Sequence, residues 1–166
     1  MLEGPVRIMD LLLGSQQAAE DRTRFLRSLF VFWLLCATDG HAKNFSLAIE
    51  PEGRFRLTPL YDVLSVWPLI GHGANQLALA RAKMAMAAVS KNRHYHWAEI
   101  QPRHWASTAA ACGYAPEEMQ RLVDEVMAGI EPAVAKVEAD LPTGFPEQVA
   151  TPIFQGVRQA ARKFQP

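Results

Sequence analysis

Apolar residues cover every side of a predicted helix that begins after Ser15 and ends near Ala37. Several of them recur at helical spacing and form one stripe, and others fall on the opposite side. The stripe consists of Phe25, Leu29, Phe32, Trp33 and Cys36, and the other side carries Phe30, Leu34 and Leu35. Because a helix that is apolar all round is usually buried, we expect this helix at the centre of the fold.

A shorter helix is predicted before it, over residues 4–13. Val6, Met9 and Leu13 recur at helical spacing and should form its apolar side. Ser15 is expected to cap the longer helix, because a serine hydroxyl can accept a hydrogen bond from a free N–H group in the first turn.

Alternating apolar and polar residues follow, from Phe45 to Ile49 and again from Phe55 to Leu57. Such alternation indicates half-buried strands, and Pro51-Glu52-Gly53 is typical of a turn between them. The sequence therefore predicts a β-hairpin that carries the chain from Asp39 to Asp62. Folding back along this hairpin could place the two acids close together.

Residues 70–96 fit two structures about equally well. Helix-forming residues are frequent between Leu77 and Ala88. Apolar residues also alternate there, as at Met84 and Met86, which fits a strand followed by a turn at Ser90-Lys91-Asn92. Both interpretations stay open on the sequence alone.

The remainder is predicted to be helical. Gln101-Pro102 favours a helix start, with an end near Gly113, and Pro116 favours the start of a second helix. Pro132 is expected to kink or divide that second helix, and a last helix is predicted from Glu147. The expected fold class is mainly α with small β-hairpins.

Length and composition agree with one soluble domain over residues 1–166. Hydrophobic residues make up 49% and charged residues 20%, which argues against disorder. Lys plus Arg and Asp plus Glu each number 17, so no net charge attracts the chain to nucleic acid or membrane. The longest apolar run, Leu29 to Ala37, is too short to span a bilayer. Cys36 and Cys112 are expected to be buried free thiols, and no signal peptide is apparent, so a cytoplasmic location is expected.

A polar loop, Thr38 to Ser46, separates the central helix from the hairpin. It holds an acid, a histidine, a lysine and a carboxamide, which are costly to bury without partners. The candidate metal ligands are Asp39, His41, Asn44 and Asp62. A metal-dependent hydrolase could use such groups, but no second histidine or cysteine pair at zinc spacing accompanies them. A nucleophilic Ser46 is a weaker alternative, because no elbow sequence surrounds it.

Phosphoryl transfer fits the spacing of these residues best. It needs an acid that accepts the proton of the attacking hydroxyl, and an amide oxygen and a carboxylate that hold Mg²⁺. In the protein-kinase catalytic loop the acid lies five residues before the asparagine, as Asp39 lies before Asn44. Lys43 supplies a cation, and Asp62 follows the predicted hairpin as a second hard oxygen ligand for Mg²⁺.

Two segments also resemble a known family. Thr-Asp-Gly-His-Ala-Lys-Asn-Phe-Ser at 38–46 and Leu-Thr-Pro-Leu-Tyr-Asp-Val-Leu-Ser at 57–65 closely resemble the HipA family of serine/threonine kinase toxins. A looser likeness continues through Gln-Pro-Arg-His at 101–104 and Leu-Pro-Thr-Gly-Phe-Pro at 141–146. The resemblance covers essentially the whole chain and implies a protein-kinase-like C-terminal lobe.

The resemblance also implies roles for individual residues. Asp39 looks like the family's catalytic base, and Asn44 and Asp62 look like its Mg²⁺ ligands. The residues that look like contacts to the phosphates of ATP are His41, Ala42, Lys43, Asn44, Tyr61 and Asp62.

The family phosphorylates serine or threonine on aminoacyl-tRNA synthetases or related translation components, and a DNA-binding antitoxin, HipB, neutralises it. A HipB-like partner is therefore expected, with nucleic acid contacted only through that antitoxin. The family's N-terminal lobe has no counterpart in these 166 residues, so the chain alone should be a poor catalyst. The alternative is a non-catalytic module, derived from a kinase, that docks an antitoxin or a target protein.

Overall fold

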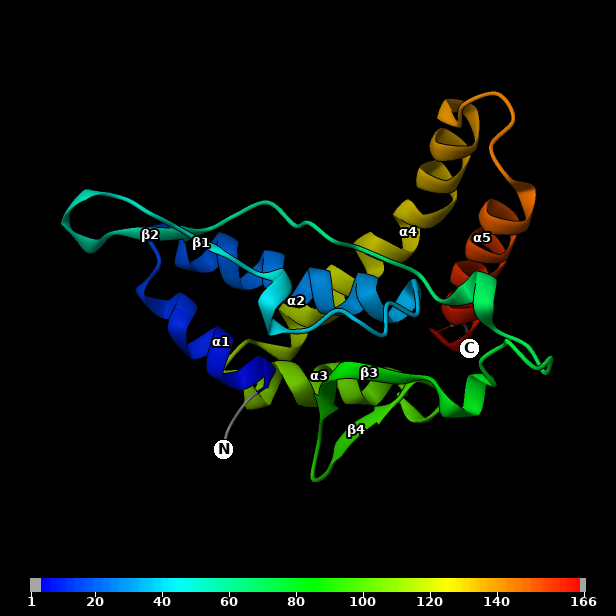
Figure 1. The fold of residues 1–166 in the computed structure, drawn as a ribbon. Coiled ribbons are helices and arrows are strands. Elements are labelled where there is room, and N and C mark those ends of the chain that lie inside the picture. Colours follow the sequence, from blue (N-terminus) through cyan, green and yellow to red (C-terminus); the bar gives the residue numbers. More distant parts are fainter. Residues whose placement is uncertain (1–3, 165–166) are drawn as a thin grey trace.

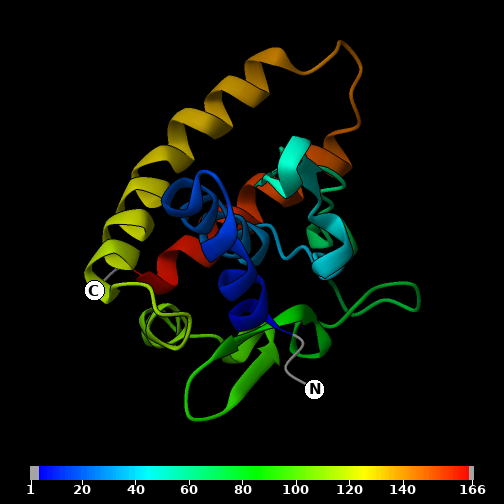
Figure 2. The same ribbon diagram turned by 90° about the vertical axis from the view of Figure 1, so that its left-hand side faces the viewer.

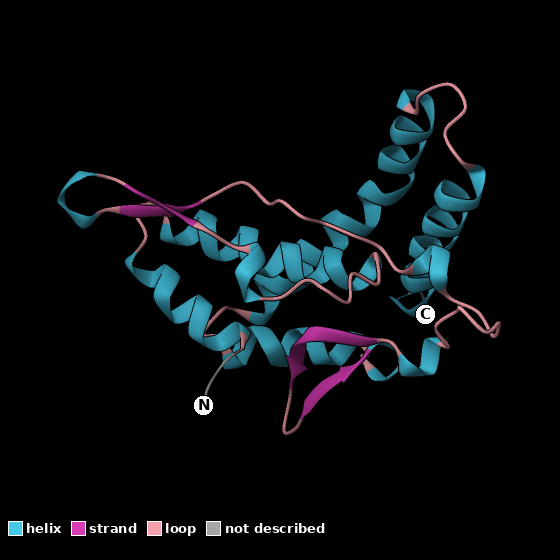
Figure 3. Ribbon diagram, viewed as in Figure 1, coloured by secondary structure: helices cyan, strands magenta, loops and turns pink. Residues whose placement is uncertain are grey.

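The computed structural model describes residues 4–164, which form a mainly helical fold with two small antiparallel hairpins (Figures 1 and 3). The helices are α1 (Pro5–Leu11), α2 (Ala18–Leu34), α3 (Pro102–Ala111), α4 (Pro116–Asp140) and α5 (Glu147–Ala161). The strands are β1 (Leu47–Ile49) paired with β2 (Phe55–Leu57), and β3 (Lys83–Val89) paired with β4 (Arg93–His96). The predicted fold class, mainly α with small hairpins, is confirmed.

Helix α2 is the centre of the fold, as its sequence predicts. It packs against α4 and α5, and the β3–β4 hairpin and α3 lie on another side of it (Figure 2). The side chains that it buries are mostly large and apolar; they include Phe25, Leu26, Leu29, Phe30, Phe32, Trp33 and Leu34. Because these side chains point in all directions around the helix, neighbours must cover it on every side.

Two predictions near the start of α2 are wrong. Leu13 is 58% exposed, because the chain tightens into a 3₁₀ turn at Leu12–Gly14 and Leu12 takes the buried position instead. The N-cap of α2 is Gln17 and not Ser15. The Ser15 hydroxyl accepts a hydrogen bond from the backbone N–H of Gln17 at 3.1 Å and donates one to the carboxylate of Asp21.

The carboxylate of Asp21 is buried on α2 and fastens the first hairpin to that helix. Its Oδ2 accepts hydrogen bonds from the backbone N–H of Leu57 in β2, at 2.8 Å, and from the Ser15 hydroxyl. The backbone N–H of Gln16 adds a bond of 3.0 Å to the carbonyl of Phe55. A buried carboxylate is costly unless its oxygens accept such bonds, so this network determines where β2 lies against α2.

The C-terminal end of α2 lies in the interior, where its last carbonyl groups cannot reach water. Side chains from two distant segments donate to them instead. The donors and acceptors are Trp97 Nε1 to the Trp33 carbonyl at 2.7 Å, Trp67 Nε1 to the Leu34 carbonyl at 2.9 Å, and the Ser65 hydroxyl to the Leu35 carbonyl at 2.6 Å. Helix ends leave carbonyls without intrahelical partners, so these three bonds attach residues 65–67 and Trp97 to the end of α2.

An aromatic cluster surrounds this helix end. The rings of Trp33 and Trp97 stack with centroids 5.4 Å apart, and Trp33 Nε1 also donates to the carbonyl of Trp97 at 3.3 Å. Trp67 meets Trp97 edge-on at 5.0 Å, and Phe30 meets Trp105 edge-on at 5.1 Å. Stacked and edge-on pairs are the favourable geometries for aromatic rings, so the cluster stabilises the region from which the polar loop emerges.

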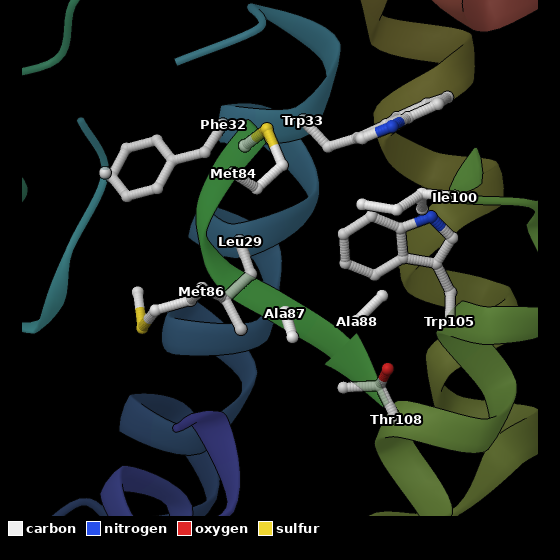
Figure 4. Close-up of a pocket in the computed structure, with 11 residues that line it drawn as sticks. Leu29, Phe32, Trp33, Met84, Met86, Ala87, Ala88, Ile100, Trp105 and Thr108 are labelled. Atoms are coloured by element: carbon white, nitrogen blue, oxygen red, sulfur yellow. The ribbon is translucent and has the colours of Figure 1, made fainter. Parts of the chain in front are cut away.

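Residues 70–96 form the extended alternative. A 3₁₀ turn at Leu79–Arg81 leads into β3, which returns through Ser90–Asn92 to β4. Figure 4 shows β3 crossing α2, with Met84 beside Phe32, while Trp105 and Thr108 of α3 line the other end of the same small pocket. Burial of the apolar side chains of β3 against α2 and α3 favours a strand here, whereas residue propensities alone fit a helix and a strand equally well.

Of the two effects expected at Pro132, a kink or a division, the division is wrong, because α4 continues through the proline to Asp140. Ile130 and Val134 are buried on either side of the proline, so packing compensates for the backbone bond that proline cannot donate. Val137 is 47% exposed, although it continues the apolar spacing. The last helix begins at Glu147, as predicted.

Both cysteines are buried and form no disulfide, as predicted. Burial raises the pKa of the Cys36 thiol to about 12 and that of Cys112 to about 11. Within residues 4–164, none of the helices combines the length and the apolar character needed to cross a bilayer.

Two histidine rings join the second hairpin to α3. His94 of β4 and His104 of α3 stack with centroids 3.8 Å apart, and His104 is buried. His104 Nδ1 accepts the backbone N–H of Gln101 at 3.2 Å, so that nitrogen carries no proton. Burial, followed by the nearby His94 and Arg103, lowers the pKa of His104 below its ordinary value of 6.5.

This arrangement predicts a loss of stability in mild acid. A base with a lower pKa in the folded state binds fewer protons there than in the unfolded state. The unfolded state is therefore stabilised relative to the folded state as the pH falls below about 6.5. The loss is limited to about 1.4 kcal/mol per pH unit for one proton. Urea unfolding at several pH values between 7.5 and 5.5 gives the free energy of unfolding as a function of pH. The slope of this free energy against pH should be smaller in His104→Phe and unchanged in the control His72→Asn, whose ring is exposed. Equal slopes in both variants would contradict this assignment.

Candidate functional site

The chain leaves α2 through a tight turn that presents Asp39 to solvent. Cys36 has a left-handed backbone conformation (φ 48°), and the N–H groups of Thr38 and Gly40 donate to the carbonyls of Cys36 and Ala37. The side chain of Asp39 is 68% exposed. The turn therefore holds an accessible carboxylate on a backbone anchored in the core.

Gly40 is required by a close contact. A Cβ atom at this position would overlap the ring of Phe32, and that ring is buried. The position also touches the small pocket beneath β3 that Phe32 and Met84 line. Glycine thus lets the turn pack directly against the core, and this packing determines the position of the neighbouring Asp39.

Asn44 and Asp62 meet across the first hairpin, whereas the sequence pointed to Asp39 as the residue near Asp62. Asn44 Nδ2 donates to Asp62 Oδ2 at 2.8 Å, and Asn44 Oδ1 accepts the backbone N–H of His41 at 3.0 Å. Asn44 is only 2% exposed and closes the 3₁₀ turn Ala42–Asn44, whereas Asp62 is exposed. Asp62 has a left-handed backbone conformation (φ 55°), which costs less for Asp than for most residues.

Asp39 and His41 form a second pair on the same loop. Asp39 Oδ1 lies 3.6 Å from His41 Nε2, and both side chains are partly or largely exposed. Among the described residues, no hydrogen bond joins Asp39 to Asn44 or to Asp62. The proposed base and the proposed metal ligands are therefore held separately, by the turn and by the hairpin.

Tyr61, Lys43 and Ser46 make a third set of contacts. The Tyr61 hydroxyl donates to the carbonyl of Lys43 at 2.8 Å and lies 2.7 Å from the Ser46 hydroxyl. The side chains of Ala42 and Lys43 are exposed at this end of the molecule. The structure thus brings the two sequence segments together, with Tyr61 and Asp62 against residues 43–46.

The sequence from residue 4 to residue 134 matches the family model described as the HipA-like C-terminal domain. The chain belongs to this family.

Named relatives agree with that membership. The chain is 35% identical over 97 residues to "Putative kinase Y4dM" of Sinorhizobium fredii (strain NBRC 101917 / NGR234), covering 58% of this chain and 24% of that protein. It superposes on HipA in the HipA, HipB and operator DNA complex of Shewanella oneidensis MR-1 with a TM-score of 0.77 and 20% identity, covering 96% of this chain and 34% of that one. The HipA-like, kinase-like fold is confirmed, and the chain spans about a quarter to a third of these relatives.

The donor atoms of this HipA-like domain fit Mg²⁺ better than they fit zinc. Asp62 offers a carboxylate, and Asn44 beside it offers a carboxamide whose oxygen also accepts the His41 N–H. Mg²⁺ commonly binds one or two protein carboxylates and completes its shell with water and phosphate. Within residues 4–164, no group of three or more His, Cys, Asp and Glu side chains could hold a metal. The hydrolase alternative, which needs Asp39, His41 and Asp62 together, therefore has no support.

The sequence reasoning missed the residues that hold this site in place. Ser65, Trp67 and Trp97 cap the end of α2, and Asp21 holds β2. A serine and a tryptophan three and five residues after Asp62 were a local signal of anchoring. The contribution of Trp97 has no local signal, because the contact joins residues 64 positions apart.

A substitution at Gly40 tests whether the turn depends on its contact with the core. Gly40→Ala should lower the free energy of unfolding by about 1–3 kcal/mol, because the added methyl must displace the buried ring of Phe32. Chemical denaturation measures this change. Gly129→Ala on α4 is the matched control: its methyl meets no atom within 4 Å, so it should be neutral or stabilise by up to about 1 kcal/mol. A free energy of unfolding in Gly40→Ala equal to that of the parent protein would contradict the contact.

Proposed function

We propose that this HipA-like domain is the catalytic lobe of a serine/threonine kinase, and that Asp39, Asn44 and Asp62 are its reacting and metal-binding groups. The single observation that carries the proposal is the hydrogen bond of 2.8 Å between Asn44 and Asp62. Asn44 lies five residues after Asp39, whose side chain is exposed. The arrangement resembles what phosphoryl transfer needs: an exposed carboxylate at Asp39, and a second carboxylate beside a carboxamide at Asp62 and Asn44.

Asp39 would act as the base. As the oxygen of a serine or threonine hydroxyl bonds to the γ-phosphorus of ATP, the bond from that phosphorus to the β,γ-bridging oxygen breaks and ADP leaves. Asp39 would take the proton that the hydroxyl loses. Its exposure supports this role, because a protein substrate must reach it.

Asn44 and Asp62 would hold Mg²⁺, which when bound neutralises charge on the phosphate oxygens. Burial of Asn44 and its bond to the His41 N–H keep the amide in place. The exposed Asp62 faces the solvent side from which a nucleotide must approach. His41, Ala42, Lys43 and Tyr61 border the same region and are proposed to lie near the phosphates of ATP.

The biological setting is proposed by relationship. The similar HipA from Shewanella oneidensis MR-1 forms a complex with HipB and operator DNA, which supports a HipB-like antitoxin as the partner of a protein containing this domain. Direct DNA contact by this domain is not proposed, because its overall charge is balanced. The substrate is proposed to be a cytoplasmic translation component such as an aminoacyl-tRNA synthetase.

Phosphate transfer by the domain joined to a HipA-type N-terminal lobe tests the proposal. Asp39→Asn should reduce the rate of labelled phosphate transfer to a serine substrate at least about 100-fold, because the amide cannot accept the proton. The fold should be unchanged, since the side chain is exposed. Asp140→Asn, which changes an exposed acid at the end of α4, should transfer normally. Normal transfer by Asp39→Asn would refute the base, and absence of transfer in the parent protein would favour the non-catalytic docking module.

A further inference from the structure

We infer that Tyr61 is a positioning residue whose hydroxyl clips the segment that carries Asp62 onto the loop that carries Asn44. The use of this clip for catalysis rests on the proposed function, but its existence and direction follow from the hydrogen bonds themselves. It involves the Tyr61 hydroxyl, the Lys43 carbonyl and the Ser46 hydroxyl.

The direction of the two bonds is determined by counting protons. A phenol has one proton, and a carbonyl oxygen can only accept. Tyr61 must therefore donate to the Lys43 carbonyl, 2.8 Å away, and this bond uses its only proton. The contact of 2.7 Å with Ser46 then requires Ser46 to be the donor. The chain of bonds runs from Ser46 through Tyr61 to the Lys43 carbonyl.

The bonds of the clip surround the metal-binding pair. Lys43 and Ser46 lie on either side of Asn44 in the sequence, and Tyr61 directly precedes Asp62. The same two segments are thus joined twice, once by Asn44 with Asp62 and once by Tyr61 with Lys43 and Ser46. Because Asp62 has a left-handed backbone conformation that needs support from its surroundings, the clip beside it keeps its carboxylate directed at Asn44.

This role differs from direct contact between Tyr61 and a phosphate. Phosphate oxygens accept hydrogen bonds, so the Tyr61 hydroxyl could donate to one only by releasing the Lys43 carbonyl. The side chain is 42% exposed, so access alone does not separate the two roles. The hydroxyl proton of Tyr61 separates them: it is already donated to the Lys43 carbonyl, which favours the positioning role.

Hydrogen exchange of the chain without nucleotide tests the clip directly. Tyr61→Phe removes only the hydroxyl, and the backbone amides of residues 41–46 and 60–65 should then exchange about threefold to tenfold faster, as expected for one lost hydrogen bond. Amides of α4 serve as the internal reference for global stability. Tyr95→Phe is the matched control, because Tyr95 is similarly exposed and its hydroxyl makes no hydrogen bond to the described residues. Unchanged exchange in Tyr61→Phe would overturn the clip.

A double-mutant cycle distinguishes positioning from phosphate contact. The affinity for ATP with Mg²⁺ is measured calorimetrically for the parent, Tyr61→Phe, Asp62→Ala and the double variant. A positioning residue acts through Asp62, so the loss of about threefold to tenfold from Tyr61→Phe should vanish in the Asp62→Ala background. Independent losses that multiply would overturn the inference. The exchange measurement uses no nucleotide, so a failure of the proposed nucleotide site and a failure of the clip give different results.

Discussion

Three carbonyl groups at the buried end of α2 must find donors, and the way they find them determines the shape of this region. Ser65 and Trp67 donate from the segment just after Asp62, and Trp97 donates from the segment that follows the second hairpin. Without these donors, the carbonyls of Leu34 and Leu35 would lose their bonds to water without replacement, at a cost of about 1–3 kcal/mol each, whereas the Trp33 carbonyl also accepts the backbone N–H of Cys36 at 3.0 Å. The end of α2 therefore draws both distant segments to the point where the polar loop begins.

The position of the site follows from that constraint. The turn carrying Asp39 leaves the capped end of α2 and lies on Phe32, so its place is set from one side. Residues 65–67 are tied to the same helix end, and the buried Asp21 holds β2 at the other. The hairpin between these attachments has little freedom, and Asn44 meets Asp62 across it. A site held by buried contacts on both sides is preorganised in the way that catalysis needs.

The sequence predicted what depends on local pattern. The apolar circumference of α2 and the alternation of the first hairpin were readable, and the structure confirms both elements. The contact of Asn44 with Asp62 is a finding of the structure, because the sequence pointed to Asp39 as the residue near Asp62. Prediction from the sequence failed where distant contacts decide. The Ser15 hydroxyl serves the buried Asp21 instead of the helix start, and packing carries α4 through Pro132. The catalytic role of Asp39 and the metal role of Asn44 and Asp62 stay predictions, because geometry alone does not show what binds there.

Calorimetric titration of the chain with ATP, with and without Mg²⁺, tests the central claim most directly. The claim is that Asn44 and Asp62 together form the metal and phosphate half of a kinase site. It predicts binding that requires Mg²⁺, that is weakened but still measurable in Asp62→Ala and that is unchanged in the exposed control Asp140→Ala. Binding that ignores Mg²⁺, or that is as tight in Asp62→Ala as in the parent, would contradict the claim, as would no binding by the parent chain.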